Sequence, residues 1–203
     1  MKLSTYTGGF CETNGFLVET PDGNFLIDAP DGVAAWVAKR GVRVDAVLLT
    51  HQHFDHVIDA AALQAAGARL YAFADYSTAL TLEEMVRQGG MNFAVAPYRI
   101  DERLVVTPGA NWPLCGFNFT LFHIPGHASD SVVFYLPALE CAFSGDTLFE
   151  GSIGRTDLPG GNHKQLLDGI ARDLLTLPPA TKLFPGHGSA TTVGREAATN
   201  PYL

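Results

Sequence analysis

The chain has 203 residues, of which 47% are hydrophobic and 17% charged, proportions typical of a globular protein with a sizeable core. The formal net charge of −8 argues against a nucleic-acid partner. No apolar run reaches the roughly 18 residues of a membrane-spanning helix, and the N-terminus lacks the pattern of a secretory signal. Cys11, Cys115 and Cys141 form no CxxC pair and no disulfide pattern. We therefore expect a cytoplasmic protein without a membrane partner.

The first half of the chain is predicted to contain strands followed by alternating helices and strands. Strands are expected at 14–20 and 24–28, on either side of a Pro-Asp-Gly turn. A helix is expected to run to about Arg40, with Asp31 as its N-cap and Gly41 ending it. Apolar spacing then predicts strands at 44–49 and 69–72, a helix at 57–66, and a helix at 81–87 with Thr81 near its N-cap. The sequence leaves the role of residues 74–100 open.

The second half repeats this order. Leucine spacing predicts a helix at 164–177, which Pro178 and Pro179 end, and a short helix is expected at 192–199. A Gly-rich loop occupies 151–161. Strands are predicted at 104–107, 116–124, 131–136, 141–144 and 182–184. Because the two halves are similar and no linker separates them, we expect a single domain covering residues 1–203.

The loop after the strand at 44–49 is the most informative stretch, because it holds four potential metal ligands within six residues. These are His51, His53, Asp55 and His56. Histidine is the commonest metal ligand, since its neutral ring offers a nitrogen lone pair. His51 and His53 are two residues apart, so an extended backbone points them to one side, whereas the other two lie at the turn into a helix. This geometry suits two adjacent metal ions better than one. A helix N-cap is the alternative role for Asp55.

Three later loops carry similar residues, each after an apolar strand and beside a glycine. They hold His127, Asp146 and His187. Glycine lets the backbone bend sharply and approach an ion closely. Two further histidines match no such loop, and we interpret His123 as a strand residue and His163 as a loop or helix-start residue.

The HxHxDH loop, followed in order by His127, Asp146 and His187, strongly resembles the metallo-β-lactamase superfamily across nearly the whole chain. The resemblance implies an α/β fold, the four-layer αββα sandwich, with a binuclear metal site at one edge. We expect zinc there, although His/Asp sites also accept iron and manganese. By the same resemblance one ion would bind His51, His53 and His127, the second would bind Asp55, His56 and His187, and Asp146 would bridge both.

Residues 143–157 and 186–201 are similar to short bacterial members of the glyoxalase II group within this superfamily. Longer members carry a C-terminal helical domain that helps bind glutathione, and with 16 residues after His187 (203 − 187) no such domain is expected here. Arg155 lies where those enzymes have a glutathione-binding Lys, and would serve an anionic substrate. The alternative is a structural pair with Asp157. Residues 128–131 and Asp59 also depart from common versions of the pattern, which leaves specificity for glutathione open.

The resemblance implies a hydroxyacylglutathione hydrolase that converts S-D-lactoylglutathione to D-lactate and glutathione. Two divalent ions about 3.5–4 Å apart bring the pKa of a shared water to about 7, and the bridging hydroxide would attack the carbonyl. Asp55 and Asp146 are the predicted catalytic residues, because they hold and orient this nucleophile. A thiolate, with a parent pKa near 8.5, leaves unprotonated. An amine would need a general acid, so a thioester is favoured over a β-lactam.

Two alternatives come from other functional classes. A persulfide dioxygenase of the same fold would use one Fe(II) on His51, His127 and Asp146. The glycine at 186 favours the hydrolase, because the dioxygenases usually have alanine there. A non-catalytic metal-binding scaffold or sensor is disfavoured by the complete ligand set. The sequence does not decide the oligomeric state.

Overall fold

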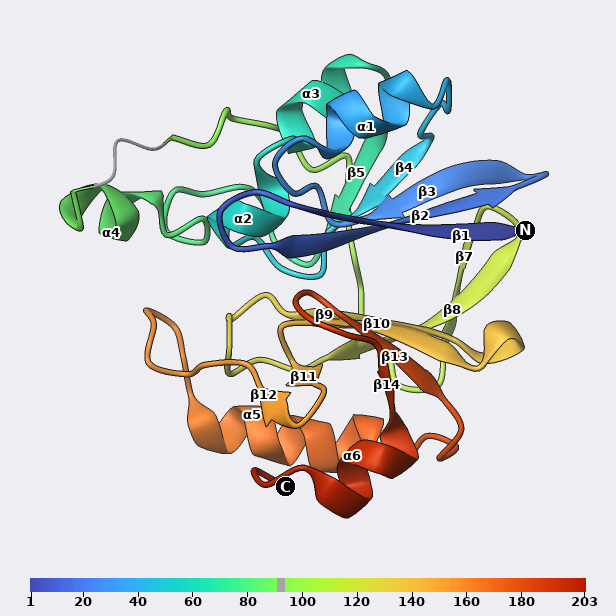
Figure 1. Ribbon diagram of the computed structural model, residues 1–203, viewed down its shortest axis with the longest axis vertical. Helices are drawn as coiled ribbons and strands as arrows, with labels where there is room; N and C mark the ends of the chain where they lie inside the picture. The colour runs from blue at the N-terminus through green and yellow to red at the C-terminus, as the bar shows by residue number, and fades with distance from the viewer. Residues whose placement is uncertain (91–93) are drawn as a thin grey trace. The chain divides into compact units, whose positions relative to one another are not determined.

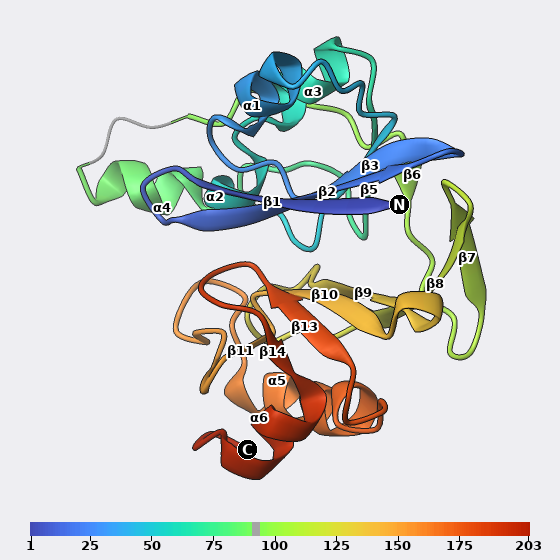
Figure 2. The ribbon, with the colours of Figure 1, turned by 45° about the vertical axis from the view of Figure 1, so that its right-hand side comes forward.

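The computed structural model describes residues 1–90 and 94–203, which form two compact units, Met1–Leu104 and Val105–Leu203. Each unit contains a six-stranded sheet with helices on one face, as Figures 1 and 2 show. The predicted α/β class is confirmed, while the prediction of a single domain stays a prediction. None of the helices in the described residues is long and apolar enough to cross a membrane.

The sheet of the first unit follows the chain order β1-β2-β3-β4-β5-β6. Its first three strands form an antiparallel meander, and from β3 onward neighbouring strands are parallel. The four strands predicted between residues 14 and 72 form, whereas the strand predicted at 104–107 does not, and a shorter strand lies at 102–103 instead. The strands are β1 (Lys2–Gly8), β2 (Thr13–Thr20), β3 (Gly23–Ile27), β4 (Ala46–Leu48), β5 (Arg69–Ala72) and β6 (Glu102–Arg103).

The first predicted helix of this unit has a different N-cap from the one expected. Helix α1 (Val33–Lys39) follows Gly32, so Asp31 is not its N-cap. Its first turn is bonded instead by Asp59, whose Oδ2 accepts from the amide of Ala34 at 2.8 Å. A carboxylate that is 25 residues away in the sequence therefore accepts a hydrogen bond from the first turn of α1, the role predicted for Asp31.

The helix predicted at 57–66 is two helices, α2 (Phe54–Val57) and α3 (Ala60–Ala65), interrupted at 58–59. The N-cap of helix α4 (Glu83–Gln88) is Leu82, so Thr81 lies next to the N-cap, as predicted, without capping the helix itself. The Thr81 hydroxyl donates to the carbonyl of Thr78 at 3.3 Å instead. Of the segment 74–100, residues 91–93 lie outside the described residues.

The core of the first unit lies between its sheet and the helices α1 and α3 (Figure 1). Val37 and Leu63 from the helices join a cluster with Leu26, Val47 and Leu70 from the strands. Burying a Val or Leu side chain stabilises a protein by roughly 1.5–3 kcal/mol. This packing fixes the sheet that carries the histidine loop.

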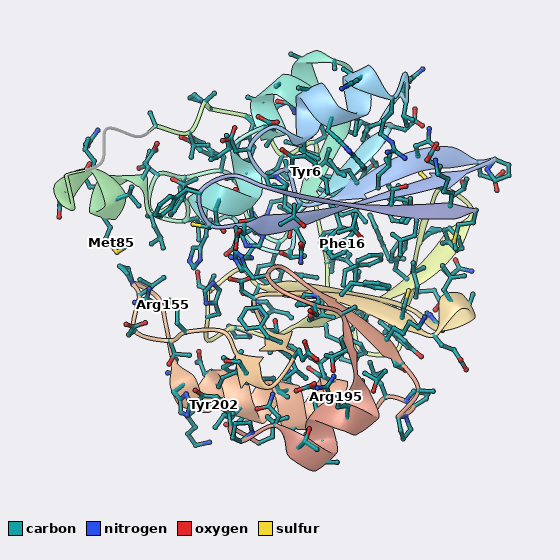
Figure 3. The ribbon with its side chains drawn as sticks, viewed as in Figure 1. Tyr6, Phe16, Met85, Arg155, Arg195 and Tyr202 are labelled. Atoms are coloured by element: carbon teal, nitrogen blue, oxygen red, sulfur yellow. The ribbon has the colours of Figure 1, made fainter. Side chains whose placement is uncertain are left out.

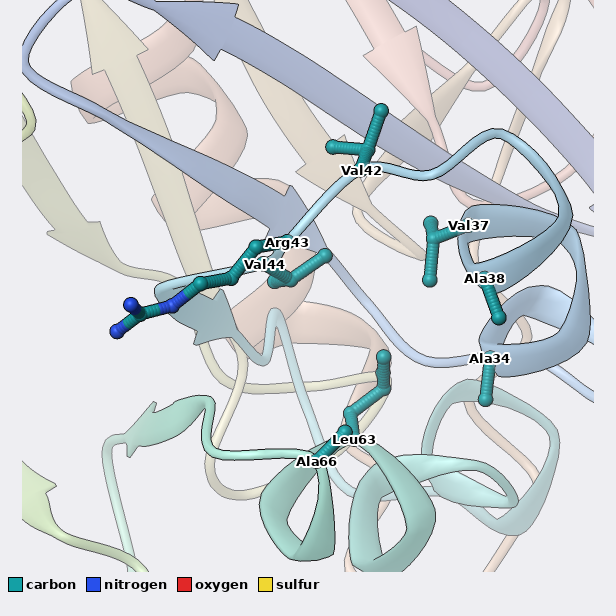
Figure 4. A pocket seen from close by; sticks show the side chains of 8 residues that line it. All are labelled: Ala34, Val37, Ala38, Val42, Arg43, Val44, Leu63 and Ala66. Atoms are coloured by element: carbon teal, nitrogen blue, oxygen red, sulfur yellow. The ribbon is translucent and has the colours of Figure 1, made fainter.

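A cavity of about 180 Å³ lies between α1 and α3 (Figure 4). It is lined by aliphatic side chains and by Arg43, whose Nε lies 3.1 Å from Asp45 Oδ1. The lining residues Val42 and Val44 precede β4, whereas the histidine loop follows that strand. The cavity is therefore apolar and at the opposite end of β4 from the predicted metal ligands.

The sheet of the second unit has the order β14-β13-β10-β9-β8-β7. The four predicted strands from 116 onward all form, whereas the short strands β7 and β14 and the hairpin of β11 and β12 were not expected. Within the predicted Gly-rich loop, Ser152 and Ile153 form one side of that hairpin. The elements are β7 (Asn111–Leu114), β8 (Phe117–His123), β9 (Val132–Leu136), η1 (Pro137–Leu139), β10 (Cys141–Gly145), β11 (Leu148–Phe149), β12 (Ser152–Ile153), β13 (Lys182–Pro185) and β14 (Thr191–Thr192).

The helices of the second unit cover one face of its sheet (Figure 2). The helix predicted at 164–177 is α5 (His163–Gly169), which continues into a π-helical segment, η2 (Ile170–Leu174). The last helix is α6 (Val193–Thr199). Leu166 and Val193 pack with Leu183 of the sheet in a second core cluster.

Gly126, beside the predicted ligand His127, provides a test of this packing. Its φ is +134°, and an added Cβ would lie 2.5 Å from the amide nitrogen of Leu166. We expect Gly126→Ala to lower the free energy of unfolding by roughly 3 kcal/mol, because backbone strain and a steric clash add. Gly151 is the matched control, since it also has positive φ but open space around it. Gly151→Ala should cost about 1 kcal/mol. Equal losses in denaturant unfolding would contradict this packing.

Candidate metal centre

The histidine loop lies at one edge of the first sheet because it follows β4. Since β3 and β4 are parallel, Asp28, directly after β3, reaches the same edge. Asp28 is buried and accepts two hydrogen bonds from Thr50, at 2.7 Å from the amide and 2.8 Å from the hydroxyl. These bonds fix the start of the loop.

Three imidazoles of this loop are brought together and buried. The ring centroid of His51 lies 4.6 Å from that of His53 and 4.1 Å from that of His56. Their exposed fractions are 1%, 5% and 0% in that order. Clustered, buried imidazoles are typical of a site that binds a cation through neutral ring nitrogens.

Hydrogen bonds to Nδ1 determine which nitrogen of each ring is available as a ligand. His56 Nδ1 lies 2.8 Å from Asp28 Oδ2, so it carries the proton and the lone pair is on Nε2. The Thr50 hydroxyl gives its proton to Asp28, and therefore accepts from His51 Nδ1 at 3.1 Å. A carboxylate that fixes a ring in this way is typical of metal-binding histidines. These neutral imidazoles, together with carboxylates, fit a zinc or iron ion.

Asp55 is the fourth predicted ligand of the first unit. It lies within the first turn of α2, whose N-cap is His53, so the alternative N-cap role is wrong. Its Oδ2 accepts a hydrogen bond from Thr13 at 2.7 Å and lies 3.4 Å from His56 Nε2. The structure therefore brings all four predicted ligands of this half together.

The three predicted ligands of the second unit also meet at one sheet edge. His127, Asp146 and His187 follow β8, β10 and β13, which run in the same direction because β9 is antiparallel to β8 and β10, and β13 is parallel to β10. Asp146 Oδ2 lies 3.4 Å from His127 Nε2 and 3.3 Å from His187 Nε2. One carboxylate oxygen thus faces two imidazoles, the arrangement expected of a bridging ligand.

Gly154 and Arg155, directly after the hairpin of β11 and β12, contact this second set. His127 Nδ1 lies 2.8 Å from the carbonyl oxygen of Arg155, which leaves Nε2 toward Asp146. An added Cβ on Gly154 would lie 1.9 Å from the carbonyl oxygen of Asp146, so only glycine permits this close approach. Buried Glu196 anchors the hairpin by accepting from the amide of Gly151 at 2.8 Å.

Arg155 forms the structural pair that the sequence left as an alternative. Its Nε and Nη2 each lie 2.7 Å from a carboxylate oxygen of Asp157, and Figure 3 shows it on the loop after β12. The hydrogen bonds from Arg155 lower the pKa of Asp157 to about 2. The pair is therefore present at neutral pH and is lost only as the pH falls through that value. Both side chains are exposed.

The remaining histidines and the buried thiol have other roles. His123 ends β8, with Nε2 2.9 Å from the carbonyl oxygen of Ser129, and His163 begins α5. Burial raises the pKa of Cys141 to about 11, so this thiol is not a nucleophile at neutral pH. These positions agree with the sequence interpretation.

Sequence reasoning missed three residues that hydrogen-bond the predicted ligands or each other at this site: Asp28, Thr50 and Thr13. Asp28 was expected only as the end of a strand. Asp28 ends the predicted strand that precedes the strand leading into the histidine loop. Parallel neighbouring strands place such ends at the same sheet edge, and this relation could have identified Asp28 from the sequence.

A family model of the metallo-beta-lactamase superfamily matches residues 8–187. The chain belongs to this superfamily. The predicted family and fold class are thus confirmed. The hydroxyacylglutathione hydrolase GloC of Haemophilus influenzae is 34% identical over 199 residues, which cover 95% of this chain and 93% of that protein.

Solved structures of the superfamily agree with this assignment. The BLEG-1 B3 metallo-beta-lactamase is 32% identical with a TM-score of 0.87, covering 100% of this chain and 99% of that one. TTHA1623 in a di-iron-bound form is 38% identical with a TM-score of 0.83, covering 98% and 100%. ETHE1 from Myxococcus xanthus is 27% identical with a TM-score of 0.74, covering 99% and 84%. Membership in this superfamily supports metal-dependent hydrolase chemistry. The di-iron-bound form of TTHA1623 leaves the identity of the metal open.

Asp28→Asn tests the role of the carboxylate that orients His56. Asparagine keeps the size and tolerates the left-handed backbone at this position, where φ is 58°, but loses the charge. We expect metal affinity to fall about 10–100-fold in titrations against a chelator. Asp45→Asn is the control, because Asp45 accepts from the amide of Asn24 at 2.9 Å and precedes β4 rather than following it. Unchanged affinity in Asp28→Asn would refute this role.

Proposed function

We propose that this protein is a metal-dependent thioester hydrolase, a hydroxyacylglutathione hydrolase that converts S-D-lactoylglutathione to D-lactate and glutathione. The observation that carries the proposal is the set of hydrogen bonds on Nδ1 of His51, His56 and His127, which leaves Nε2 of each ring as the ligand atom. The 34% identity to GloC of Haemophilus influenzae supports the substrate class.

The proposed site holds two divalent ions. When bound, the ions supply a nucleophilic hydroxide at neutral pH and polarise the carbonyl of the substrate. Zinc is the expected metal, and iron is supported by the di-iron-bound form of TTHA1623. His51, His53 and His127 would hold one ion and Asp55, His56 and His187 the other, with Asp146 between them.

The protein side chains orient the reaction. Hydrolysis forms a bond between a water oxygen and the acyl carbon, breaks the acyl carbon–sulfur bond, and releases a carboxylate and a thiol. Thr13 holds Oδ2 of Asp55 at 2.7 Å, so this carboxylate is positioned to orient the attacking oxygen. The thiolate, with a parent pKa near 8.5, leaves without a general acid.

We further propose that residues 1–203 act as one domain in the cytoplasm. The proposed ligands come from both units, so catalysis needs both. The spacing of the three cysteines in the sequence matches neither a CxxC pair nor a disulfide pattern, which fits a reducing compartment. A small-molecule thioester is the proposed partner, and the net charge of −8 gives no basis for a nucleic acid.

Metal analysis of His187→Ala tests the second ion. Wild-type protein should contain about two metal ions per chain and hydrolyse S-D-lactoylglutathione, whereas His187→Ala should contain about one and lose roughly a thousandfold in kcat/KM, because an ion contributes several kcal/mol of charge stabilisation. His123→Ala is the matched control from the same unit and should keep both ions.

One iron per chain, oxygen uptake on glutathione persulfide and an unchanged metal content in His187→Ala would instead identify the dioxygenase. Fully metallated protein without turnover on thioesters or persulfides would identify a scaffold.

Arg155 is proposed to bind an anionic group of the substrate, in exchange for its pair with Asp157. We expect Arg155→Ala to raise KM about three- to tenfold with little change in kcat, since an exposed ion pair contributes up to about 1 kcal/mol. Asp157→Ala should leave KM unchanged or lower it, because the guanidinium is released from its partner. Steady-state kinetics on the glutathione thioester measures both. A KM that rises equally in both variants would show that the pair is only structural.

A further inference from the structure

Gln52 lies between the proposed ligands His51 and His53 and is fully buried. Side chains alternate along an extended backbone, so Gln52 points away from the two histidines. Its amide is held at both ends. Nε2 donates to the carbonyl of Ala74 at 2.9 Å, and Oε1 accepts from the hydroxyl of Tyr98 at 2.9 Å. A polar side chain buried directly behind the ligands is thus hydrogen-bonded on both sides.

Ala74 and Tyr98 both belong to residues 74–100, the part of the chain whose role the sequence left open. A second tie joins this segment to the histidine loop, because the amide of Phe54 donates to the carbonyl of Thr81 at 3.1 Å. Thr81 is fully buried. Among the described residues, the segment thus contacts the loop both at the Gln52 side chain and at the Phe54 backbone.

Within this segment, Glu83 links two other residues by hydrogen bonds. Its carboxylate accepts from the Tyr76 hydroxyl at 3.3 Å and from the amide of Val95 at 2.9 Å. The Tyr76 ring packs edge-on against Tyr98, with centroids 4.8 Å apart. Burial and the adjacent Glu83 raise the pKa of Tyr76, so its hydroxyl stays a donor at neutral pH. Tyr76 and Tyr98 are adjacent tyrosines whose hydroxyls have different partners. The Tyr98 hydroxyl donates to Gln52, whereas the Tyr76 hydroxyl donates to Glu83.

We propose that Tyr98 is a positioning residue, which acts through Gln52 to fix the backbone between His51 and His53 for metal binding. The inference deepens the proposed function, because it takes these two histidines as ligands. Partners that hydrogen-bond metal ligands directly change metal affinity 10–100-fold. Tyr98 hydrogen-bonds Gln52, which lies between the two proposed ligands. We therefore expect loss of its hydroxyl to lower metal affinity by about tenfold, the lower end of that range.

The test compares Tyr98→Phe with Tyr76→Phe in the full chain. Each variant keeps its ring and loses one hydroxyl. Co(II) binding is titrated against a chelator, the visible absorption bands of the bound Co(II) report the ligand geometry, and thermal unfolding is measured on the metal-free proteins. Tyr98→Phe should weaken Co(II) binding about tenfold and shift the bands. Tyr76→Phe should change affinity less than about twofold.

A double-mutant cycle with Gln52→Met keeps the test informative if Tyr98→Phe also lowers stability. If Tyr98 acts through Gln52, the affinity loss from Tyr98→Phe disappears in the Gln52→Met background. Equal effects of the two tyrosine variants, unchanged Co(II) binding in Tyr98→Phe, or additive losses in the cycle would overturn the positioning role. They would leave the proposed hydrolase intact. A wild-type chain that binds no metal overturns both.

Discussion

The carboxylate of Asp28 organises the histidine loop, because one buried group meets both Thr50 and His56. It fixes the backbone where β4 ends, and through the Thr50 hydroxyl it also selects the proton position on His51. A buried carboxylate is unfavourable unless it is hydrogen-bonded. The loop supplies those bonds, so the ligands and the group that orients them stabilise one another.

In both units, strand direction brings the proposed ligands and the residues that orient them to one sheet edge. Strands that run in one direction deliver their following loops to one sheet edge, as β3 and β4 do for Asp28 and the histidine loop. Strands β8, β10 and β13 do so for the three later ligands. The three proposed ligands of the second unit are therefore far apart in sequence but adjacent at one sheet edge, and the same holds for Asp28 and the histidine loop in the first unit. In each unit, helices on one face of the sheet bury the core that keeps the edge rigid.

The sequence predicted the chemistry better than the local structure. The residue types of the HxHxDH loop and the strand before it are visible in the chain itself, as are glycines at 126 and 186. The role of Asp28 depends on the parallel pairing of β3 with β4, and the capping of α1 by Asp59 depends on a contact across 25 residues. Such contacts leave no local pattern. The two-residue strands β11 and β12 are too short to show periodicity, and so the hairpin that leads to Gly154 and Arg155 was missed.

The hydrogen bonds by which Asp28, Thr50 and Thr13 orient the histidine loop all lie within residues 1–104. Chains are synthesised from the N-terminus at about 5–20 residues per second, so the 83 residues that lead from Leu104 to His187 (187 − 104) follow over roughly 4–17 s. The proposed ligands of the first unit are thus synthesised and oriented before those of the second. Under the proposed assignment, neither ion has its full ligand set until His127, Asp146 and His187 have followed.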